Sequence, residues 1–201
     1  VQVYFSESLA RLPLELKAVR PTMFLAPPRV WERMYSTIAT EIRKRGPATR
    51  QLFYMAVGAG AKAYRYKQEG RPVPGYLARL VKLFDRPVYS KIRERLGGEI
   101  RVAISGSAPL AKDLADFFGA IGLPMVEGYG LSEAGVTTMN PVDRPKSGSI
   151  GKMLPGVEAK LAEDGELMIG GPTLFNGYFR DRDATESVMR GGWLLTGDIG
   201  E

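Results

Sequence analysis

The chain contains the stretch Val126-Glu127-Gly128-Tyr129-Gly130-Leu131-Ser132-Glu133-Ala134-Gly135, in which side chains that can bind a nucleotide are interspersed with glycines. The glycines allow tight turns and let backbone N–H groups approach a ligand closely. Tyr129 offers a flat ring and a hydroxyl, Ser132 a hydroxyl for a phosphate oxygen, and Glu133 a hard carboxylate suited to Mg²⁺. A structural loop with a packed Tyr129 and a solvated Glu133 is the alternative interpretation.

Short apolar runs before this stretch predict the strands of a parallel sheet. The run Ile100–Ile104 leads through Ser105–Leu110, a turn with glycine and serine, into a helix expected over 111–120. The run Leu123–Val126 predicts the next strand, with the motif at its end, and Thr22–Ala26 predicts another. Such strand ends place backbone N–H groups at the carboxyl edge of the sheet, where α/β proteins bind ligands. The sequence therefore predicts an α/β fold with its site at that edge.

A helical insertion is predicted over about 29–96, with helices from Arg29, over 49–68 and over 75–96, the last interrupted at Pro87. Residues 1–100 hold 19 Lys and Arg against 8 Asp and Glu, a net charge of +11, whereas residues 101–201 hold 9 against 14, a net charge of −5. A basic region of this kind suits an anionic membrane, a nucleic acid or an anionic substrate, and solvated helix faces give the same pattern.

The character of the chain changes after Thr138 from alternating strands and helices to short strands and turns. Residues 156–162 and 166–170 alternate apolar and polar side chains around Glu163-Asp164-Gly165, which predicts a β-hairpin. A short helix is expected over 181–189. We therefore predict an α/β portion over 1–138 and a small β-rich, distorted barrel-like portion over 139–201 that is incomplete at its C-terminal end.

The composition excludes several kinds of chemistry. The chain has neither cysteine nor histidine, so it lacks thiolate nucleophiles, the usual general base and the commonest metal ligand. Gly130–Ala134 is similar to the nucleophile elbow of serine hydrolases, but alanine holds the fifth position and no histidine can take the serine proton. No apolar run approaches the roughly 20 residues of a membrane-spanning helix, and a cytoplasmic location is expected.

The central stretch resembles the Tyr-Gly-x-Thr/Ser-Glu signature of the adenylate-forming enzymes, a family that includes acyl-CoA synthetases and luciferases. Other family motifs follow in the expected order. Arg20–Glu32, which contains Pro-Arg-Val-Trp-Glu before a long helical insertion, is similar to a segment of long-chain fatty-acid CoA synthetases, and Trp31 within it suits either core packing or acyl contact. The further matches are Gly106 to Leu110, Gly165 to Tyr178, and Gly192-Trp193-Leu194-Leu195-Thr196-Gly197-Asp198.

The resemblance implies an ATP-dependent ligase with ATP, a fatty acid and coenzyme A as substrates, Mg²⁺ as cofactor and no nucleic-acid partner. A fatty carboxylate attacks the α-phosphate to give an acyl-adenylate and pyrophosphate, and the coenzyme A thiol then displaces AMP. Among the site residues, Ser132 and Glu133 are the implied catalytic residues, with Glu133 as the metal ligand. The implied nucleotide-binding residues are Gly106, Glu127, Gly128, Tyr129, Gly130, Ser132 and Asp198, where Tyr129 packs on adenine, Ser132 bonds the α-phosphate and Asp198 accepts the ribose hydroxyls.

Two elements of the family are not found in this sequence, namely the phosphate loop that ends in Pro-Lys-Gly and the C-terminal domain with its adenylation lysine. The chain does not begin with Met, and we expect it to be an interior piece of a longer enzyme and inactive by itself. A fatty-acyl-AMP ligase that does not use coenzyme A and a non-catalytic nucleotide-binding fragment remain alternatives. The basic insertion and the acyl substrate also suit a peripheral contact with membranes.

Overall fold

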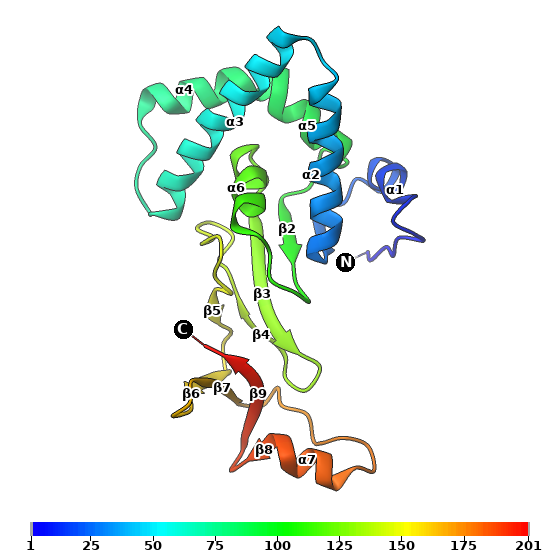
Figure 1. Ribbon diagram of the computed structural model, residues 1–201, viewed down its shortest axis with the longest axis vertical. Helices are drawn as coiled ribbons and strands as arrows, with labels where there is room; N and C mark the ends of the chain where they lie inside the picture. Colours follow the sequence, from blue (N-terminus) through cyan, green and yellow to red (C-terminus); the bar gives the residue numbers. More distant parts are fainter. Residues whose placement is uncertain (1, 201) are drawn as a thin grey trace. The chain divides into compact units, whose positions relative to one another are not determined.

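A computed structural model describes residues 2–200 of the chain (Figure 1). Contacts divide the chain into two compact units, each of which is described by itself. The first comprises the residues up to Glu127 together with Pro141–Ser149, and the second comprises Gly128–Asn140 and the residues from Ile150 onward. The division into folding domains at residue 138 stays a prediction, since compactness alone does not define a domain.

The first unit contains a parallel sheet, as the sequence predicts. Its strands are β1 (Met23–Ala26), β2 (Val102–Ser105) and the first residues of β3 (Met125–Leu131). Met23 is the register partner of Val102, and Ala103 is the register partner of Met125. Ser105 and Glu127 are also register partners, so the last residue of β2 lies beside the last residue that β3 contributes to this unit.

Six α-helices accompany this sheet in the described part of the first unit. They are α1 (Leu12–Val19), α2 (Pro28–Arg43), α3 (Pro47–Gln68), α4 (Gly75–Phe84), α5 (Ser90–Arg95) and α6 (Lys112–Ala120). Trp31 lies at the centre of the core with no exposed surface, and its indole N–H donates to the carbonyl oxygen of Ala26 at 3.1 Å. The rings of Phe24 and Phe118 contact it edge-on, at centroid distances of 5.1 and 5.3 Å. Trp31, which lies on α2, therefore packs this helix against β1 and α6.

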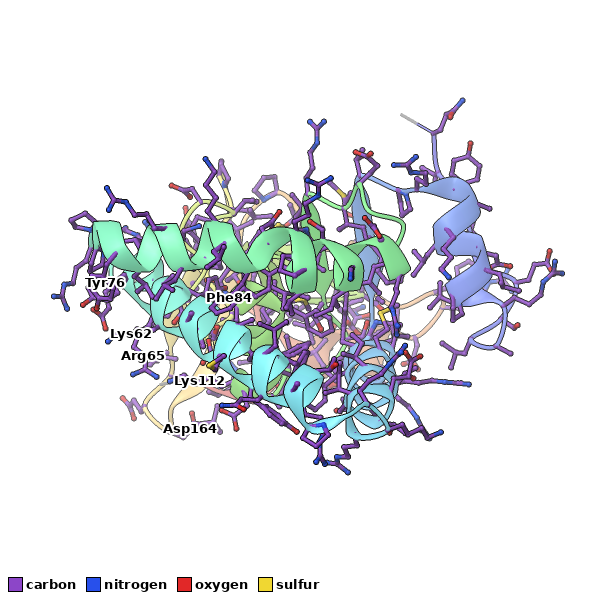
Figure 2. The ribbon with its side chains drawn as sticks, turned by 90° about the horizontal axis from the view of Figure 1, so that it is seen from above. Lys62, Arg65, Tyr76, Phe84, Lys112 and Asp164 are labelled. Atoms are coloured by element: carbon purple, nitrogen blue, oxygen red, sulfur yellow. The ribbon has the colours of Figure 1, made fainter. Side chains whose placement is uncertain are left out.

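The expected helix over 75–96 runs through Pro87 in a wider form. A π-helical turn, η1 (Asp85–Tyr89), joins α4 to α5. Proline removes one backbone donor and its ring clashes with the carbonyl one turn earlier, and a wider turn relieves both effects without ending the helix. Tyr89 is buried here and donates to the carbonyl oxygen of Ala56 on α3 at 2.5 Å. Figure 2 shows α3 and α4 side by side, with Tyr76 near the start of α4 and Lys62 and Arg65 projecting from α3.

The second unit is built from antiparallel strands. The remaining residues of β3 pair with β4 (Gly135–Met139), which pairs with β5 (Lys152–Met153). A separate sheet has the order β6-β7-β9-β8. Its elements and the adjoining helix are β6 (Glu158–Leu161), β7 (Glu166–Gly170), α7 (Arg182–Val188), β8 (Met189–Arg190) and β9 (Trp193–Ile199). The predicted hairpin is confirmed as β6 and β7, and Gly165 in its turn has φ +87°.

The structure differs from the sequence expectations in where two site segments lie. The central motif does not follow the end of a strand, because β3 continues through Leu131 and the turn begins only at Ser132. Asp198 lies within β9, a strand that the family motif does not predict. Both differences have one cause, because each segment pairs with an antiparallel strand, the first with β4 and the second with β7. Neither segment alternates apolar and polar residues, so its sequence does not predict this pairing.

Within residues 2–200, no helix has the length and apolar character needed to cross a membrane.

Two glycines of α3 provide a matched test of helix packing. A Cβ added at Gly60 would lie 2.1 Å from the carbonyl oxygen of Ala120, whereas a Cβ added at Gly58 would meet no atom within 4 Å. We expect Gly60→Ala to destabilise the whole protein by about 1–3 kcal/mol through overpacking, and Gly58→Ala to stabilise it by up to about 1 kcal/mol. The thermal midpoints of the two variants measure this difference. Equal midpoints would show that α3 and α6 do not pack this closely.

Candidate active site

Tyr129 and Asp198, which are 69 residues apart in the chain, are joined directly in the second unit. The Tyr129 hydroxyl donates to Asp198 Oδ2 at 2.5 Å. Burial of the ring, followed by this hydrogen bond to a carboxylate, raises the pKa of Tyr129 to about 12. The hydroxyl therefore stays protonated at neutral pH and remains a donor. The two residues that the family resemblance assigns to adenine and ribose thus lie together at one place, a half-buried ring beside an exposed carboxylate.

The strand that carries Asp198 holds it by a set of short hydrogen bonds. The Thr196 hydroxyl donates to the carbonyl oxygen of Leu167 on β7 at 2.6 Å and accepts the backbone N–H of Asp198 at 3.1 Å. The backbone N–H of Gly197 donates to Glu166 Oε1 at 2.7 Å. Gly197 has φ +73°, a conformation that favours glycine. The Thr-Gly-Asp sequence therefore orients the Asp198 carboxylate, because Thr196 hydrogen-bonds both β7 and the Asp198 backbone and Gly197 supplies the positive φ between them.

Gly128 and Gly130 serve close strand pairing and not the turn conformations expected from the sequence. Neither has positive φ, and of the three glycines in the motif only Gly135 does, with φ +65°. A Cβ at Gly130 would lie 2.2 Å from the carbonyl oxygen of Gly135, and one at Gly128 would lie 3.1 Å from that of Thr138. The register also shifts between Tyr129 and Gly130, a bulge that alters the direction of the following residues.

Ser132 and Glu133 lie in the turn between β3 and β4. Ala134, with no exposed surface, anchors this turn in the core of the second unit beside Ile169 and Leu194. The Ser132 side chain is exposed and makes no hydrogen bond to the described residues 2–200. Its hydroxyl is therefore free to donate to an anionic ligand, which is the property that the sequence prediction requires.

Glu133 is fastened through both its side chain and its backbone. The Tyr178 hydroxyl donates to Glu133 Oε1 at 2.8 Å, and the backbone N–H of Phe175 donates to the carbonyl oxygen of Glu133 at 2.7 Å. The hydrogen bond to Glu133 raises the pKa of Tyr178, so this hydroxyl also stays protonated at neutral pH. Tyr178 ends the family match that begins at Gly165, but nothing in the sequence predicts its contact with Glu133.

Glu127 and Gly106 belong to the first unit. Glu127 is 9% exposed, and its carboxylate accepts two backbone N–H groups: Oε1 from Leu110 at 3.1 Å and Oε2 from Gly148 at 3.3 Å. These bonds hold the loop after β2, which contains the half-buried Gly106, and the loop before residue 150. Glu127 therefore organises two loops of this unit through its side chain. Its own contact with a nucleotide stays a prediction, as does that of Gly106.

The residues of the second unit fit a magnesium ion that is shared with a nucleotide. Among residues 2–200, no group of three or more acidic, cysteine or histidine side chains is placed to hold a metal alone. Mg²⁺ in nucleotide-dependent enzymes is usually bound by one or two carboxylates, with the remaining ligands from phosphates and water. Glu133 is partly exposed and has an oxygen left beside the one that accepts from Tyr178. One such carboxylate is the donor set that this kind of site needs.

The chain belongs to the family of AMP-binding enzymes, whose family model matches residues 2–179. It is 37% identical to the long-chain-fatty-acid–CoA ligase FadD15 of Mycobacterium bovis over 202 residues, which cover 100% of this chain and 33% of the relative. The chain thus spans about a third of the length of this relative.

Two solved structures extend the comparison. A malonyl-CoA ligase in a ternary product complex with methylmalonyl-CoA and AMP is 25% identical with a TM-score of 0.56, over 96% of this chain and 33% of that one. The adenylation domain of a carboxylate reductase from Mycobacterium chelonae is 25% identical with a TM-score of 0.66, over 96% of this chain and 27% of that one. The mixed α/β fold predicted from the sequence is confirmed by these similarities and by the parallel and antiparallel sheets.

The bonds of Glu127 predict a loss of stability when one acceptor is removed. In Glu127→Gln, an amide NH₂ group replaces one of the two carboxylate oxygens, so the N–H of Leu110 or of Gly148 loses its acceptor. We expect a destabilisation of about 1–3 kcal/mol in the whole protein and faster hydrogen exchange at these two amides. The exposed Glu163→Gln is the matched control and should change neither. Unchanged exchange at both amides in Glu127→Gln would contradict the assignment.

Proposed function

We propose that the whole protein to which this chain belongs activates a long-chain fatty acid with ATP and transfers the acyl group to coenzyme A. The observation that carries the proposal is the Tyr129–Asp198 hydrogen bond, because it unites the residues that the resemblance assigns to the base and the sugar of one nucleotide. The family match to AMP-binding enzymes and the 37% sequence identity to a long-chain-fatty-acid–CoA ligase also support ATP, a fatty acid and coenzyme A as substrates.

The adenosine part of ATP is bound by Tyr129 and Asp198 in this proposal. The Tyr129 ring packs against adenine, and the Asp198 carboxylate, which has two acceptor oxygens, takes the hydroxyls of the ribose. The Tyr129 hydroxyl already bonds Oδ2, so it fixes the carboxylate before the nucleotide arrives. Such preorganisation lowers the ordering cost of binding. Gly106 and Glu127 complete the proposed nucleotide-binding residues, together with Gly128 and Gly130.

The phosphates are bound by Ser132 and Glu133. Ser132 donates to an α-phosphate oxygen through its exposed hydroxyl, and Glu133 holds the Mg²⁺ that accompanies ATP. The ion, when bound, neutralises charge on the phosphate oxygens. A fatty carboxylate oxygen then forms a bond to the α-phosphorus while the bond to pyrophosphate breaks, and the thiol of coenzyme A next displaces AMP from the acyl carbon. The adenylation step needs no histidine, because it depends on positioned donors and charge.

The alternative within the family is adenylation without transfer to coenzyme A. The similarity to the adenylation domain of a carboxylate reductase is the observation that favours this alternative. A segment that binds nucleotide without catalysis is the third candidate, and it applies to this chain taken alone. The cytoplasmic location and the contact of the basic helical insertion with membranes stay predictions.

The metal role of Glu133 is tested by Glu133→Gln in the whole protein. The amide keeps the shape and an acceptor for the Tyr178 hydroxyl but removes the charge, so we expect fatty-acid-dependent exchange of pyrophosphate into ATP to fall by a factor on the order of 100. Thermal unfolding should change little. If the wild type makes acyl-CoA from palmitate, ATP and coenzyme A, the ligase is established; exchange without acyl-CoA favours the acyl-AMP alternative. Unchanged exchange in Glu133→Gln would remove the metal assignment.

The sugar role of Asp198 predicts a loss of nucleotide affinity. Removal of charge-assisted hydrogen bonds in Asp198→Ala should cost about 1.5–3 kcal/mol, which corresponds to about 10- to 100-fold in the Michaelis constant for ATP. Asp198→Asn keeps one acceptor and should lose less. The Michaelis constant for the fatty acid is the internal control and should stay the same. An effect confined to fatty-acid preference would contradict the role of Asp198 in binding ribose.

A further inference from the structure

The segment that leads into α7 is attached to Glu133 at two points, one through the backbone and one through a side chain. The loop lies between β7 and α7 and is drawn in orange in Figure 1. Its Phe175 N–H bonds the Glu133 carbonyl oxygen, and its Tyr178 hydroxyl bonds Glu133 Oε1, at 2.7 and 2.8 Å. A single hydrogen bond between exposed groups is commonly incidental, but two bonds from one short loop to one residue fix its backbone and its side chain together.

Tyr178 is itself held by α7. The Thr185 hydroxyl accepts the backbone N–H of Tyr178 at 2.9 Å and donates to the carbonyl oxygen of Asp181 at 2.8 Å. The Asp181 side chain caps α7 by accepting the N–H of Ala184 at 2.9 Å. The rings of Phe175 and Tyr178 also meet edge-on, with their centroids 4.9 Å apart. A chain of contacts therefore runs from the start of α7 through Tyr178 to one oxygen of Glu133.

We propose that Tyr178 is a positioning residue that holds the Glu133 carboxylate in place for the divalent cation that enters with the nucleotide. The inference rests on the proposed metal role of Glu133. A glutamate side chain turns about three single bonds, and ordering it upon binding would weaken affinity. The hydroxyl of Tyr178 removes this freedom by occupying Oε1, and it leaves Oε2 available. Because the hydroxyl is a neutral donor, the carboxylate also keeps its negative charge, which a lysine or arginine in the same place would offset.

A purely structural tie between the loop and the turn is the competing explanation. In that case the loss of the Tyr178 hydroxyl would lower the thermal midpoint and leave cation affinity unchanged. Tyr178→Phe separates the two explanations because it removes the oxygen alone. The ring remains to pack on Phe175, and the side chain is 38% exposed, so the variant has no reason to misfold.

The experiment measures cation binding directly in the full-length protein. Mn²⁺ serves as the probe, and the electron paramagnetic resonance signal of free Mn²⁺ is followed during titration in the presence of ATP, since bound Mn²⁺ contributes little to it. A titration of ATP without protein gives the Mn²⁺ bound by the nucleotide alone, which is subtracted. We expect Tyr178→Phe to raise the half-saturating Mn²⁺ concentration by about 3- to 10-fold, the loss of one hydrogen bond. The Mg²⁺ concentration that half-saturates pyrophosphate exchange should rise by the same factor, and exchange at saturating Mg²⁺ should return to the wild-type rate.

Two control variants complete the design. Tyr76→Phe removes a hydroxyl from an exposed tyrosine on α4 and should leave both constants unchanged. A Glu133→Gln/Tyr178→Phe double variant should bind Mn²⁺ no more weakly than Glu133→Gln alone, because Tyr178 acts only through the charge of Glu133.

Three results would overturn the inference: an unchanged Mn²⁺ constant in Tyr178→Phe, a loss of exchange that high Mg²⁺ does not restore, or additive effects in the double variant. Failure of the proposed function has a different signature, since the wild type itself would then show no fatty-acid-dependent exchange. The Mn²⁺ titration does not depend on that activity, so it tests Tyr178 in either case.

Discussion

The hydrogen-bond ladder of β3 is the constraint on which the rest of this structure depends. Up to Glu127 the strand pairs in parallel with β2, and from Gly128 onward it pairs antiparallel with β4. The same strand therefore contributes to both compact units and carries Glu127 and Tyr129 close to the point where its partner changes. The two backbones at β3 and β4 approach so closely that only hydrogen fits as the side chain at residue 130.

The interactions at the site use the strands as rigid supports and leave the polar groups exposed. Thr196 ties β9 to β7 and aims Asp198, whereas Ala134 anchors the turn that holds Ser132 and Glu133. Tyrosine hydroxyls then bond the two carboxylates of the proposed site, Tyr129 to Asp198 and Tyr178 to Glu133. Both carboxylates are thus oriented by neutral donors. The chain has no histidine, and a tyrosine hydroxyl orients a carboxylate by a hydrogen bond without offsetting its negative charge.

The sequence predicts the helices and the parallel strands well, because periodic apolar positions and the apolar runs at residues 22–26 and 100–104 carry their own signals. The strands β4 and β9 escape, since they form by pairing, β4 with β3 and β9 with β7, and not by a local alternation of apolar and polar residues. Pro87 is similar: the sequence marks a break, but packing of Tyr89 and its neighbours maintains the helix through a π turn. The motifs identify Tyr129, Glu133 and Asp198 as candidates by resemblance. Their hydrogen-bond partners could not be predicted, because side-chain contacts over 45 and 69 residues leave no local pattern.

The bond between Tyr129 and Asp198 has a consequence for the choice between ribonucleotides and deoxyribonucleotides. In the proposed role of Asp198, the Tyr129 hydroxyl uses one of the two lone pairs on Oδ2, so this oxygen can still accept one ribose hydroxyl while Oδ1 accepts the other. A deoxyribose offers only one hydroxyl there, and one of these two hydrogen bonds is not made. The oxygen without a sugar hydroxyl lies on an exposed side chain and is hydrated by water instead, so the difference amounts to a single hydrogen bond. A site built in this way discriminates only weakly against the deoxy sugar.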